Sequence, residues 1–265
     1  MSTTQFETLA CEEPSPGVLL VRLNRPEAAN ALNTQMGRDL HALFSGLILD
    51  PGETRCLVLT GAPAKAFCAG ADLKERNGMS DADWRRQHAI FEQAAYAVMD
   101  CPIPAIAAVN GAAYAGGCEL ALACDFIYAA EDARFAQTET ALGLIPGIGG
   151  TQNLPRAVGS RRARELILSA VPFSAAEALE WGLVNRVAPL AELVPAALAT
   201  ASRIAANAPL AVRQAKRAIS VGAETDLKTG LALEIEAYNR AASSEDRREG
   251  VAAFNEKRPP RFQGR

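Results

Sequence analysis

Hydrophobic residues in the first half of the chain fall into short, nearly continuous runs separated by longer stretches with helical spacing. Four such runs occupy residues 18–23, 56–61, 105–109 and 126–130. Runs of this length without polar interruption are typical of strands buried on both faces of a sheet. Helices are predicted between them, at residues 34–49 with Asn33 as the N-cap, and from Ser80 toward Asp100. This alternation predicts an α/β protein with a largely parallel, covered sheet.

From residue 160 onward the pattern changes to one helix after another. Helices are predicted at residues 161–169, 174–181, 190–206, 210–220 and 226–242. Ser174 and Glu177 have the spacing of a capping box. No internal repeat or low-complexity linker is visible, so two independently folding domains are not expected. We predict a core at residues 1–195 and a helical region at residues 196–265 that docks on the core or on another subunit.

The composition is that of an ordinary globular protein: 265 residues, 49% hydrophobic and 22% charged. A formal net charge of -3 creates no overall positive field that would attract nucleic acid or an anionic membrane. No run of about 18 apolar residues occurs, and residues 1–13 lack the features of a targeting leader. The six cysteines form no C-x-x-C pair. We therefore expect a reduced, cytoplasmic protein without nucleic-acid or membrane partners.

Two glutamates are the best candidates for proton chemistry, because the chain has only two histidines, His41 and His88, and these offer no metal-ligand or triad spacing. Glu119 follows Gly116 on an otherwise apolar helix, and Glu139 follows a second small-residue turn. Taken singly, each acid could simply stabilise the first turn of a helix. If they converge, their pKa values separate, so that one carboxyl can donate a proton while the other accepts one.

Small-residue turns follow two of the predicted strands, at residues 65–73 and 115–117. Glycine and alanine let a ligand approach the main chain, and free N–H groups at a helix start attract negative charge. Two such groups could form an oxyanion hole, although glycines also serve tight turns alone. The cluster at 145–151 lacks the Lys-Ser/Thr of a phosphate-binding loop and is interpreted as a structural turn into a helix. The basic residues at 161–164 are interpreted as a solvated helix face.

Taken in order, these segments resemble the crotonase superfamily, the enoyl-CoA hydratases and isomerases, over nearly the whole chain. The most specific stretches are residues 66–74, 108–111, 116–121 and 144–152. The resemblance implies a crotonase-like ββα superhelix core with a helical C-terminal trimerisation region. It also implies that the N–H groups of Ala71 and Gly116 hold the thioester carbonyl of an acyl-CoA. Glu119 and Glu139 would then hold the attacking water.

The resemblance favours hydration of an enoyl-CoA, because relatives that only move a double bond commonly keep the second acid alone. The run at residues 67–76 looks most like a branch that includes methylglutaconyl-CoA hydratases, which suggests a short or branched acyl group. Ala115, Ala136 and Thr138 depart from the residues that are common in the family. An enoyl-CoA isomerase, or a non-catalytic binding protein with this fold, stays as an alternative.

The same resemblance implies a binding site for coenzyme A and an oligomer. Trimers, often paired into hexamers, would place the C-terminal helices at subunit contacts. No metal or redox cofactor is implied, since the substrate itself carries coenzyme A. The residues implied to bind the acyl-CoA are Ala28, Ala69, Asp72, Leu73 and Lys74, with Phe254 and Lys257 reaching the acyl-CoA of a neighbouring subunit.

Overall fold

The strands form two sheets in the computed structural model. It describes residues 6–63 and 66–265. Lys65, at the start of one predicted turn, lies outside the described residues. The larger sheet has the order β1-β2-β3-β5-β7-β10. Its strands are β1 (Leu9–Ser15), β2 (Val18–Leu23), β3 (Cys56–Gly61), β5 (Ala105–Val109), β7 (Phe126–Ala130) and β10 (Arg186–Ala188). The smaller sheet, β4-β6-β8-β9, contains β4 (Ala66–Cys68), β6 (Ala112–Tyr114), β8 (Arg134–Ala136) and β9 (Phe173–Ser174).

The larger sheet is parallel from β2 to β10, and only the edge strand β1 runs antiparallel to its neighbour. Every residue of β3 and β5 is buried, which explains why these runs contain no polar interruption apart from Thr60. The predicted α/β class and the largely parallel sheet are therefore confirmed. Strand β1 was not predicted, because most of its residues are polar and exposed, as an edge strand permits.

The smaller sheet arises from a repeated local plan that the hydrophobic pattern did not predict. Strands β3, β5 and β7 are each followed within a few residues by a short strand of the second sheet and then by a helical turn or a helix. This strand–strand–helix repeat is the ββα unit that the family resemblance implied. Asn110 connects the ends of β3 and β5, where the chain passes to the smaller sheet: its Oδ1 accepts a hydrogen bond from Gly61 N at 3.0 Å. Strands of three residues are too short to show a periodic pattern.

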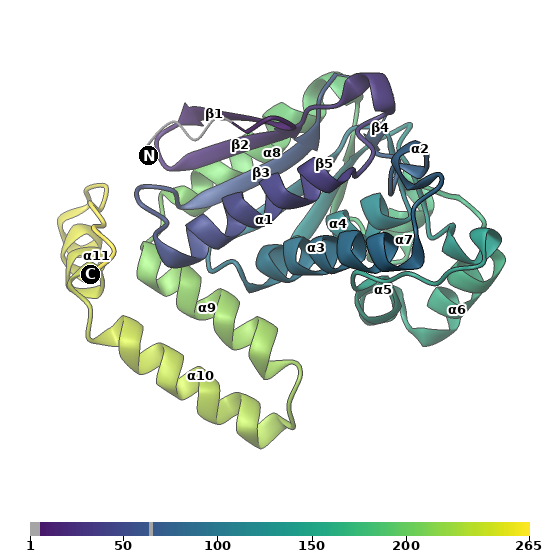
Figure 1. The fold of residues 1–265 in the computed structure, drawn as a ribbon. Coiled ribbons are helices and arrows are strands. Elements are labelled where there is room, and N and C mark those ends of the chain that lie inside the picture. The colour runs from purple at the N-terminus through teal and green to yellow at the C-terminus, as the bar shows by residue number, and fades with distance from the viewer. Residues whose placement is uncertain (1–5, 64–65) are drawn as a thin grey trace.

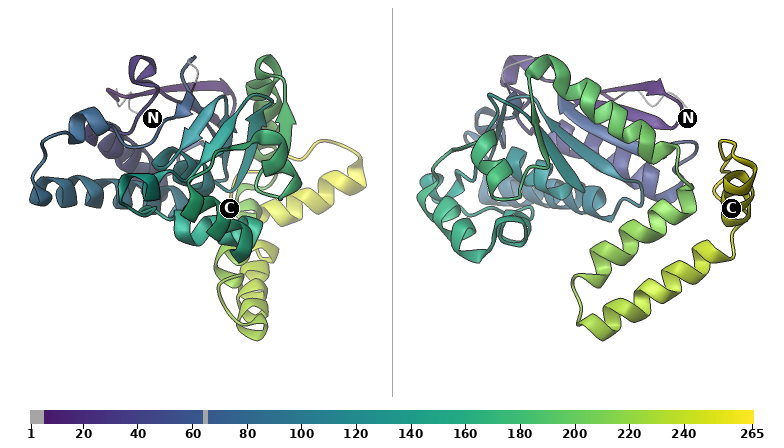
Figure 2. Two further views of the ribbon diagram at one scale, coloured as in Figure 1. Left: turned by 90° about the vertical axis from the view of Figure 1, so that its right-hand side faces the viewer. Right: turned by 180° about the vertical axis from the view of Figure 1, so that it is seen from behind.

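Helices cover both faces of the larger sheet. Helices α1 (Thr34–Leu49) and α3 (Asp81–Asp100) lie on one side, and α8 (Leu190–Ala205) lies along the other (Figures 1 and 2). Asn33 and Ser80 cap α1 and α3 as predicted, each accepting a hydrogen bond from a first-turn N–H. The other elements of the core are η1 (Pro26–Ala28), α2 (Leu73–Arg76), α4 (Gly116–Ala123), η2 (Glu139–Leu142), α5 (Gly150–Val158), α6 (Ser160–Ser169) and α7 (Ala175–Glu180).

Three C-terminal helices, α9 (Pro209–Gly222), α10 (Leu227–Ala242) and α11 (Glu245–Glu256), extend away from the sheets (Figure 1). Helix α11 was not predicted, because its sequence is mostly polar; Ser244 caps it by accepting from Arg247 N at 3.0 Å. The boundary expected between residues 195 and 196 lies inside α8, which packs on the sheet as one helix. The division into two regions stays a prediction, and the part that leaves the core begins with α9.

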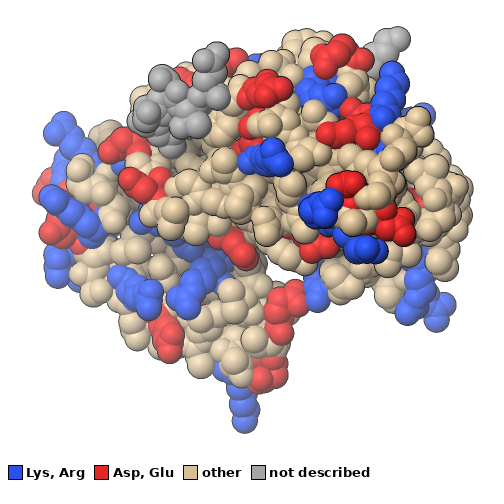
Figure 3. Space-filling model, viewed as in Figure 1, with Lys and Arg blue, Asp and Glu red and all other residues tan. Residues whose placement is uncertain are grey.

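Charges of both signs are interspersed over the face of the molecule seen in Figure 3. This mixed surface agrees with the small net charge of the chain and gives no single-sign field on that face. Among residues 6–63 and 66–265, no helix has both the length and the apolar character needed to cross a membrane.

Candidate active site

A cavity of about 660 Å³ lies among the turn after β4, helix α3, the N-terminus of α4 and the segment around η2. A space of this size fits a small-molecule group. Its walls are mainly apolar, and three acids, Glu92, Glu119 and Glu139, line it together with two small-residue turns. The lining includes Leu32, Ala71, Phe91, Gly116, Glu119, Glu139, Leu144 and Ile148. The two glutamates and the two turns that were singled out in the sequence therefore line one cavity.

Two main-chain N–H groups are free to bind a ligand in this cavity. The turn after β4 is held by hydrogen bonds from Leu32 N to Gly70 O and from Asp72 N to Leu32 O, both 2.8 Å, which leave Ala71 N unused. Gly116 begins α4, where first-turn N–H groups have no partner within the helix. In the described part of the chain, neither Ala71 N nor Gly116 N donates to any acceptor. Their predicted role as two donors to one oxygen atom stays a prediction.

Ala115, just before α4, has a backbone conformation that favours glycine. Its φ of 49° and ψ of -123° correspond to the first central position of a type II′ turn. The strain is maintained by the surrounding structure: Ala115 N donates to Ala136 O at 2.8 Å, and Glu119 N donates to Ala115 O at 3.0 Å. These bonds fix the direction in which the next residue, Gly116, presents its N–H group.

Replacing Ala115 by glycine is expected to raise the free energy of unfolding by about 1 kcal/mol, because the strain of an L-residue at this φ and ψ exceeds the extra unfolded-state entropy of glycine. Denaturant unfolding of Ala115→Gly measures the change. The matched control is Ala89→Gly on the exposed face of α3, which is expected to lower the stability by about 1 kcal/mol. A loss of stability in both variants would contradict the assigned strain.

Glu119 is almost completely buried, with 2% of its surface exposed. Its Oε1 accepts hydrogen bonds from Ile148 N at 2.9 Å and from Gly150 N at 2.7 Å. Gly150 must lack a side chain for this contact, because a Cβ there would lie 3.0 Å from Glu119 Cγ and 2.8 Å from Pro146 Cβ. The glycine cluster at 145–151 leads into a helix, as interpreted from the sequence. Its N–H groups also hold a buried carboxylate, which was not predicted.

Glu139 begins η2 and is buried beside Glu119, with 8% of its surface exposed. The two carboxyls lie within hydrogen-bonding reach of each other. Gln137 is completely buried, and in the amide orientation that satisfies its surroundings its side-chain nitrogen lies 3.2 Å from both oxygens of Glu139. Gln137 therefore orients Glu139.

The two carboxyls differ in their tendency to hold a proton. Burial and then the charge of Glu119 raise the pKa of Glu139 to about 7. Burial also raises the pKa of Glu119 above its usual value, but the N–H groups of Gly150 and Ile148 oppose this shift by stabilising the carboxylate. Of the two carboxyls, Glu139 is therefore the one without opposing main-chain N–H donors from the 145–151 segment, and its pKa lies near neutrality.

Comparison with known proteins places this cavity in a family. The family described as "Enoyl-CoA hydratase/isomerase" matches residues 13–265. The chain is 42% identical to the short-chain-enoyl-CoA hydratase of Clostridium acetobutylicum, over 91% of this chain and 92% of that protein. The chain belongs to the enoyl-CoA hydratase/isomerase family.

Other members of this family match over their full length. The crotonyl-CoA hydratase of Syntrophomonas wolfei is 38% identical, over 97% of this chain and 98% of that protein. The crystal structure of an enoyl-CoA hydratase from Bacillus anthracis superposes with a TM-score of 0.95 at 46% identity, covering 98% of this chain and all of that one. The family resemblance and the crotonase fold are therefore confirmed.

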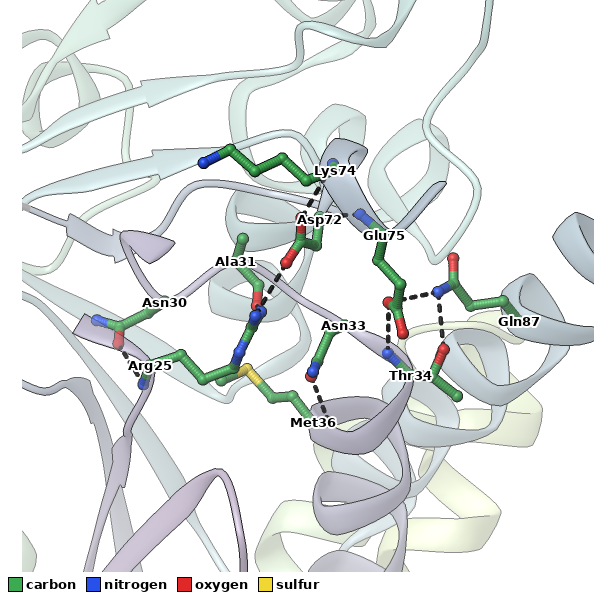
Figure 4. Close-up of polar contacts among 10 residues, drawn as sticks. All are labelled: Arg25, Asn30, Ala31, Asn33, Thr34, Met36, Asp72, Lys74, Glu75 and Gln87. Atoms are coloured by element: carbon green, nitrogen blue, oxygen red, sulfur yellow. Dashed lines mark hydrogen bonds and ion pairs between the residues drawn. The ribbon is translucent and has the colours of Figure 1, made fainter. Parts of the chain in front are cut away.

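Among the residues that the family resemblance implied for acyl-CoA binding, Ala69 and Leu73 line the cavity. The side chain of Asp72 makes contacts within the protein. It caps α2 by accepting a hydrogen bond from Lys74 N at 3.0 Å, and it forms a 2.9 Å ion pair with Arg25 (Figure 4). Lys74 is exposed on α2 beside this ion pair. Ala28, at the end of η1, does not belong to the cavity wall. Their contacts with coenzyme A stay predictions.

Within a single chain, Phe254 and Lys257 lie far from the cavity. Both are exposed, on and just after α11, and Figure 1 shows α11 at one edge of the molecule and α2 toward the opposite side. Their predicted role toward a neighbouring subunit stays a prediction. In residues 6–63 and 66–265, no group of three or more His, Cys, Asp or Glu side chains is arranged to hold a metal ion.

Proposed function

We propose that this protein is an enoyl-CoA hydratase that adds water across the 2,3 double bond of a short or branched enoyl-CoA thioester. The observation that carries the proposal is the meeting, in one cavity, of two buried carboxyls with two main-chain N–H groups that have no acceptor among the described residues. Hydration needs a base that takes a proton from water, an acid that gives a proton to C2, and a site that stabilises negative charge on the thioester oxygen. In the proposed reaction, Glu119, Glu139 and the two N–H groups supply these three roles.

The reaction begins at the thioester carbonyl. Its oxygen accepts hydrogen bonds from Ala71 N and Gly116 N, which stabilise the negative charge that develops there. This polarisation draws electrons from the double bond and makes C3 electrophilic. Glu119 accepts a proton from the water as the water oxygen forms a bond to C3, and the electron pair of the double bond moves toward the thioester to give an enolate.

Glu139 completes the addition. It gives its proton to C2, the enolate pair forms the C2–H bond, and the thioester carbonyl is restored. Glu119 now holds the proton from water and Glu139 is ionised. Since the two carboxyls lie within hydrogen-bonding reach, a proton transfer from Glu119 to Glu139 restores the resting state. The cycle consumes one water and no net proton.

The second candidate is an isomerase that moves the double bond, for which one glutamate and the oxyanion site suffice. The hydrogen bonds to Glu119 favour hydration, because two main-chain N–H groups stabilise the ionised form of this second, buried carboxyl. A non-catalytic binding protein would have no use for such a costly pair.

An absorbance assay tests the proposal. Purified protein is expected to remove the conjugated thioester absorbance of crotonyl-CoA, and the 3-hydroxy product is expected to carry ¹⁸O when the reaction is run in labelled water. A 3-enoyl-CoA is supplied in parallel. Formation of conjugated thioester from the 3-enoyl-CoA, without label uptake from crotonyl-CoA, would establish the isomerase instead.

The rate should depend on pH through Glu139. We expect kcat/KM for crotonyl-CoA to fall as the pH rises through about 7. Burial and the charge of Glu119 raise the pKa of Glu139 to about 7, and only the protonated form of Glu139 can give a proton to C2. A pH–rate profile extending about two units to either side of neutrality measures this fall. A profile that stays flat or rises above neutrality would contradict the assignment of Glu139 as the acid.

Gln137→Met provides the matched variant for this profile. It removes the side-chain nitrogen that lies 3.2 Å from both oxygens of Glu139 and would stabilise its ionised form. The fall of kcat/KM is therefore expected to move to higher pH. A shift to lower pH would show that Gln137 does not act on Glu139 in this way.

We also propose that the protein forms a homotrimer, with trimers paired into a hexamer. Large apolar side chains that are more than half exposed on α9, α10 and α11 support this assembly, since such surfaces mark association sites. They are Ile219, Leu227, Ile235, Tyr238, Val251 and Phe254. Light scattering of the purified protein tests it, and a monomer would contradict it.

A cytoplasmic location is proposed as well. All six cysteines are free thiols, and five of them are buried, which suits a reducing compartment. Fractionation of the source cells with an antibody against the protein would test this location.

A further inference from the structure

Resting on the proposed hydratase reaction, we propose that Arg25 is a positioning residue for the oxyanion site, because its guanidinium fixes the segment that presents the Ala71 N–H group to the thioester oxygen. Arg25 directly precedes η1 and does not belong to the cavity wall. It therefore acts on the reaction through the main chain, and no catalytic step described above uses it.

The segment around Ala71 lies on a template formed by residues 25–32. Leu32 N donates to Gly70 O, and Asp72 N donates to Leu32 O, both at 2.8 Å. The peptide group between Gly70 and Ala71 is planar and trans, so its N–H points away from its carbonyl. Because Leu32 binds that carbonyl, the Ala71 N–H group is directed away from the template, toward the cavity that Ala71 lines.

Arg25 joins the template to this segment through the two ends of its guanidinium. Nη1 donates to Ala31 O at 2.7 Å, and Nη2 donates to Asp72 Oδ2 at 2.9 Å (Figure 4). Ala31 precedes Leu32 and Asp72 follows Ala71, so the guanidinium spans the β-bridge between Leu32 and Ala71. A planar group with donors at a fixed separation holds both partners in place, which a flexible ammonium group does not.

The template is anchored to the start of β4 by Asn30, which is completely buried. Its Oδ1 accepts from Arg25 N at 2.9 Å, and its Nδ2 donates to Ala66 O at 3.0 Å. Arg25 therefore extends its side chain from a main chain that is itself fixed to β4. A movement of Asp72 relative to this frame would carry the Ala71 N–H group out of position.

The ion pair between Arg25 and Asp72 is sheltered from water, unlike an ordinary surface salt bridge. The two side chains are 18% and 11% exposed. Burial alone would raise the pKa of Asp72, but hydrogen bonds from Arg25 and from N–H groups of α2 outweigh it and lower this pKa below its ordinary value. Loss of one partner would leave the other charge poorly solvated and unpaired, which destabilises more than loss of an exposed pair.

Capping of α2 does not account for the ion pair. Asp72 Oδ1 already caps this helix by accepting from Lys74 N at 3.0 Å and from Glu75 N at 3.3 Å. The other oxygen, Oδ2, accepts from Arg25. Asp72 thus divides its two oxygens between the helix that follows Ala71 and the template, so that the Ala71 N–H group is fixed from both sides.

Infrared spectroscopy of a bound, unreactive thioester tests the position of the Ala71 N–H group without relying on turnover. The probe is butyryl-CoA labelled with ¹³C at the thioester carbonyl, which has no double bond to hydrate. Hydrogen bonds to its oxygen lower the frequency of the carbonyl stretch, so wild type is expected to shift this band downward on binding. Arg25→Met is expected to lose a large part of the downshift. Its kcat for crotonyl-CoA should fall by about a hundredfold, as a misplacement of about 1 Å can cause, while KM changes little.

Three further variants sharpen the test. Arg25→Lys keeps the charge but loses the planar fork, so it should recover only part of the downshift and of kcat. Asp72→Asn breaks the ion pair from the other side and keeps a side-chain oxygen for the cap of α2. It should match Arg25→Met, and it decides the test if Arg25→Met does not fold. Arg22→Met, which removes the solvent-exposed pair with Glu12, should leave the band and the rate unchanged.

Three results would overturn the proposal. An unchanged band and kcat in Arg25→Met, with only a lower melting temperature, would show a purely structural role. A higher KM with an unchanged band would show that Arg25 binds coenzyme A directly. No downshift in wild type would show that Ala71 N does not meet the thioester oxygen. Hydration of crotonyl-CoA is assayed on the same wild-type preparation, and its absence, together with a downshift that depends on Arg25, would reject the hydratase reaction and not the positioning role.

Discussion

Glu119→Gln is expected to lower kcat/KM for enoyl-CoA hydration by about a thousandfold, within the range found for loss of a general base. The amide has the shape of the carboxyl, and its oxygen can still accept from Ile148 N and Gly150 N, which lie 2.9 and 2.7 Å from Glu119 Oε1. What it cannot do is take a proton from water. Initial rates with crotonyl-CoA measure the loss, and thermal unfolding checks that the fold is kept.

The variant should also change the pKa of its partner. The charge of Glu119 is one of the causes that raise the pKa of Glu139, and Glu119→Gln removes that charge. The pKa of Glu139 is therefore expected to fall toward its ordinary value, so that the acid is lost together with the base at neutral pH. For this reason the double variant Glu119→Gln with Glu139→Gln should be little slower than either single variant, since residues that act as a unit are not additive.

Glu180→Gln serves as the control for this series, because it makes the same change at an exposed position of α7. It is expected to leave the rate and the stability unchanged. If Glu119→Gln or the double variant kept more than about a tenth of the wild-type rate, the assigned proton chemistry would be rejected.

The prediction from sequence succeeded where local signals decide structure. Asn33 and Ser80 precede helical patterns, and a helix start needs a nearby acceptor for its first N–H groups, so both caps were found. The runs that became β3 and β5 are apolar apart from Thr60 because both faces of these strands are covered. Here the residues near each position contain the information that fixes the structure.

The convergence of Glu119 and Glu139 depends on contacts that no local pattern contains. Glu119 follows β6 through the start of α4, and Glu139 follows β8, so their approach depends on the pairing of β6 with β8. Each of these strands has three residues and shows no period. The sequence indicated the two acids and the family resemblance related them, but only the strand pairing explains why the carboxyls meet.

The supports of the site were missed for a related reason. Ile148 and Gly150 act through main-chain N–H groups, so their side chains carry no chemical signal. Arg25 stands in a polar turn, where an arginine is ordinarily solvent-exposed; its ion-pair partner Asp72 lies 47 positions further along the chain. The positions of these groups are set by tertiary packing and not by their neighbours in sequence.

Gly117→Ala is expected to lower the free energy of unfolding by about 3 kcal/mol or more. This lies at the upper end of the cost of overpacking, because the added Cβ forces the backbone to move. A Cβ at Gly117 would lie 2.1 Å from Cys68 O and 2.8 Å from Cys68 C. Both are main-chain atoms at the end of β4, so no side-chain rotation can relieve the clash. The start of α4 and the end of β4 must move apart.

This movement should also damage catalysis, because Gly116 precedes Gly117 on α4 and Ala71 follows β4. The two N–H groups would no longer meet on one oxygen, and loss of one such donor costs about a hundredfold or more in kcat. Denaturant unfolding and initial rates with crotonyl-CoA measure the two effects. If the variant is too unstable to purify at room temperature, refolding yield and activity in the cold replace the equilibrium measurement.

Gly46→Ala provides the opposite control. Gly46 lies on the exposed side of α1, and a Cβ there would meet nothing within 4 Å. Alanine should therefore stabilise the protein by about 0.5 to 1 kcal/mol through its higher helix propensity, with no change in rate. Because the chemical change is the same at both sites, a difference in sign isolates the contact with Cys68. Full stability and activity in Gly117→Ala would show that β4 and α4 are not held together in the way that positions the oxyanion donors.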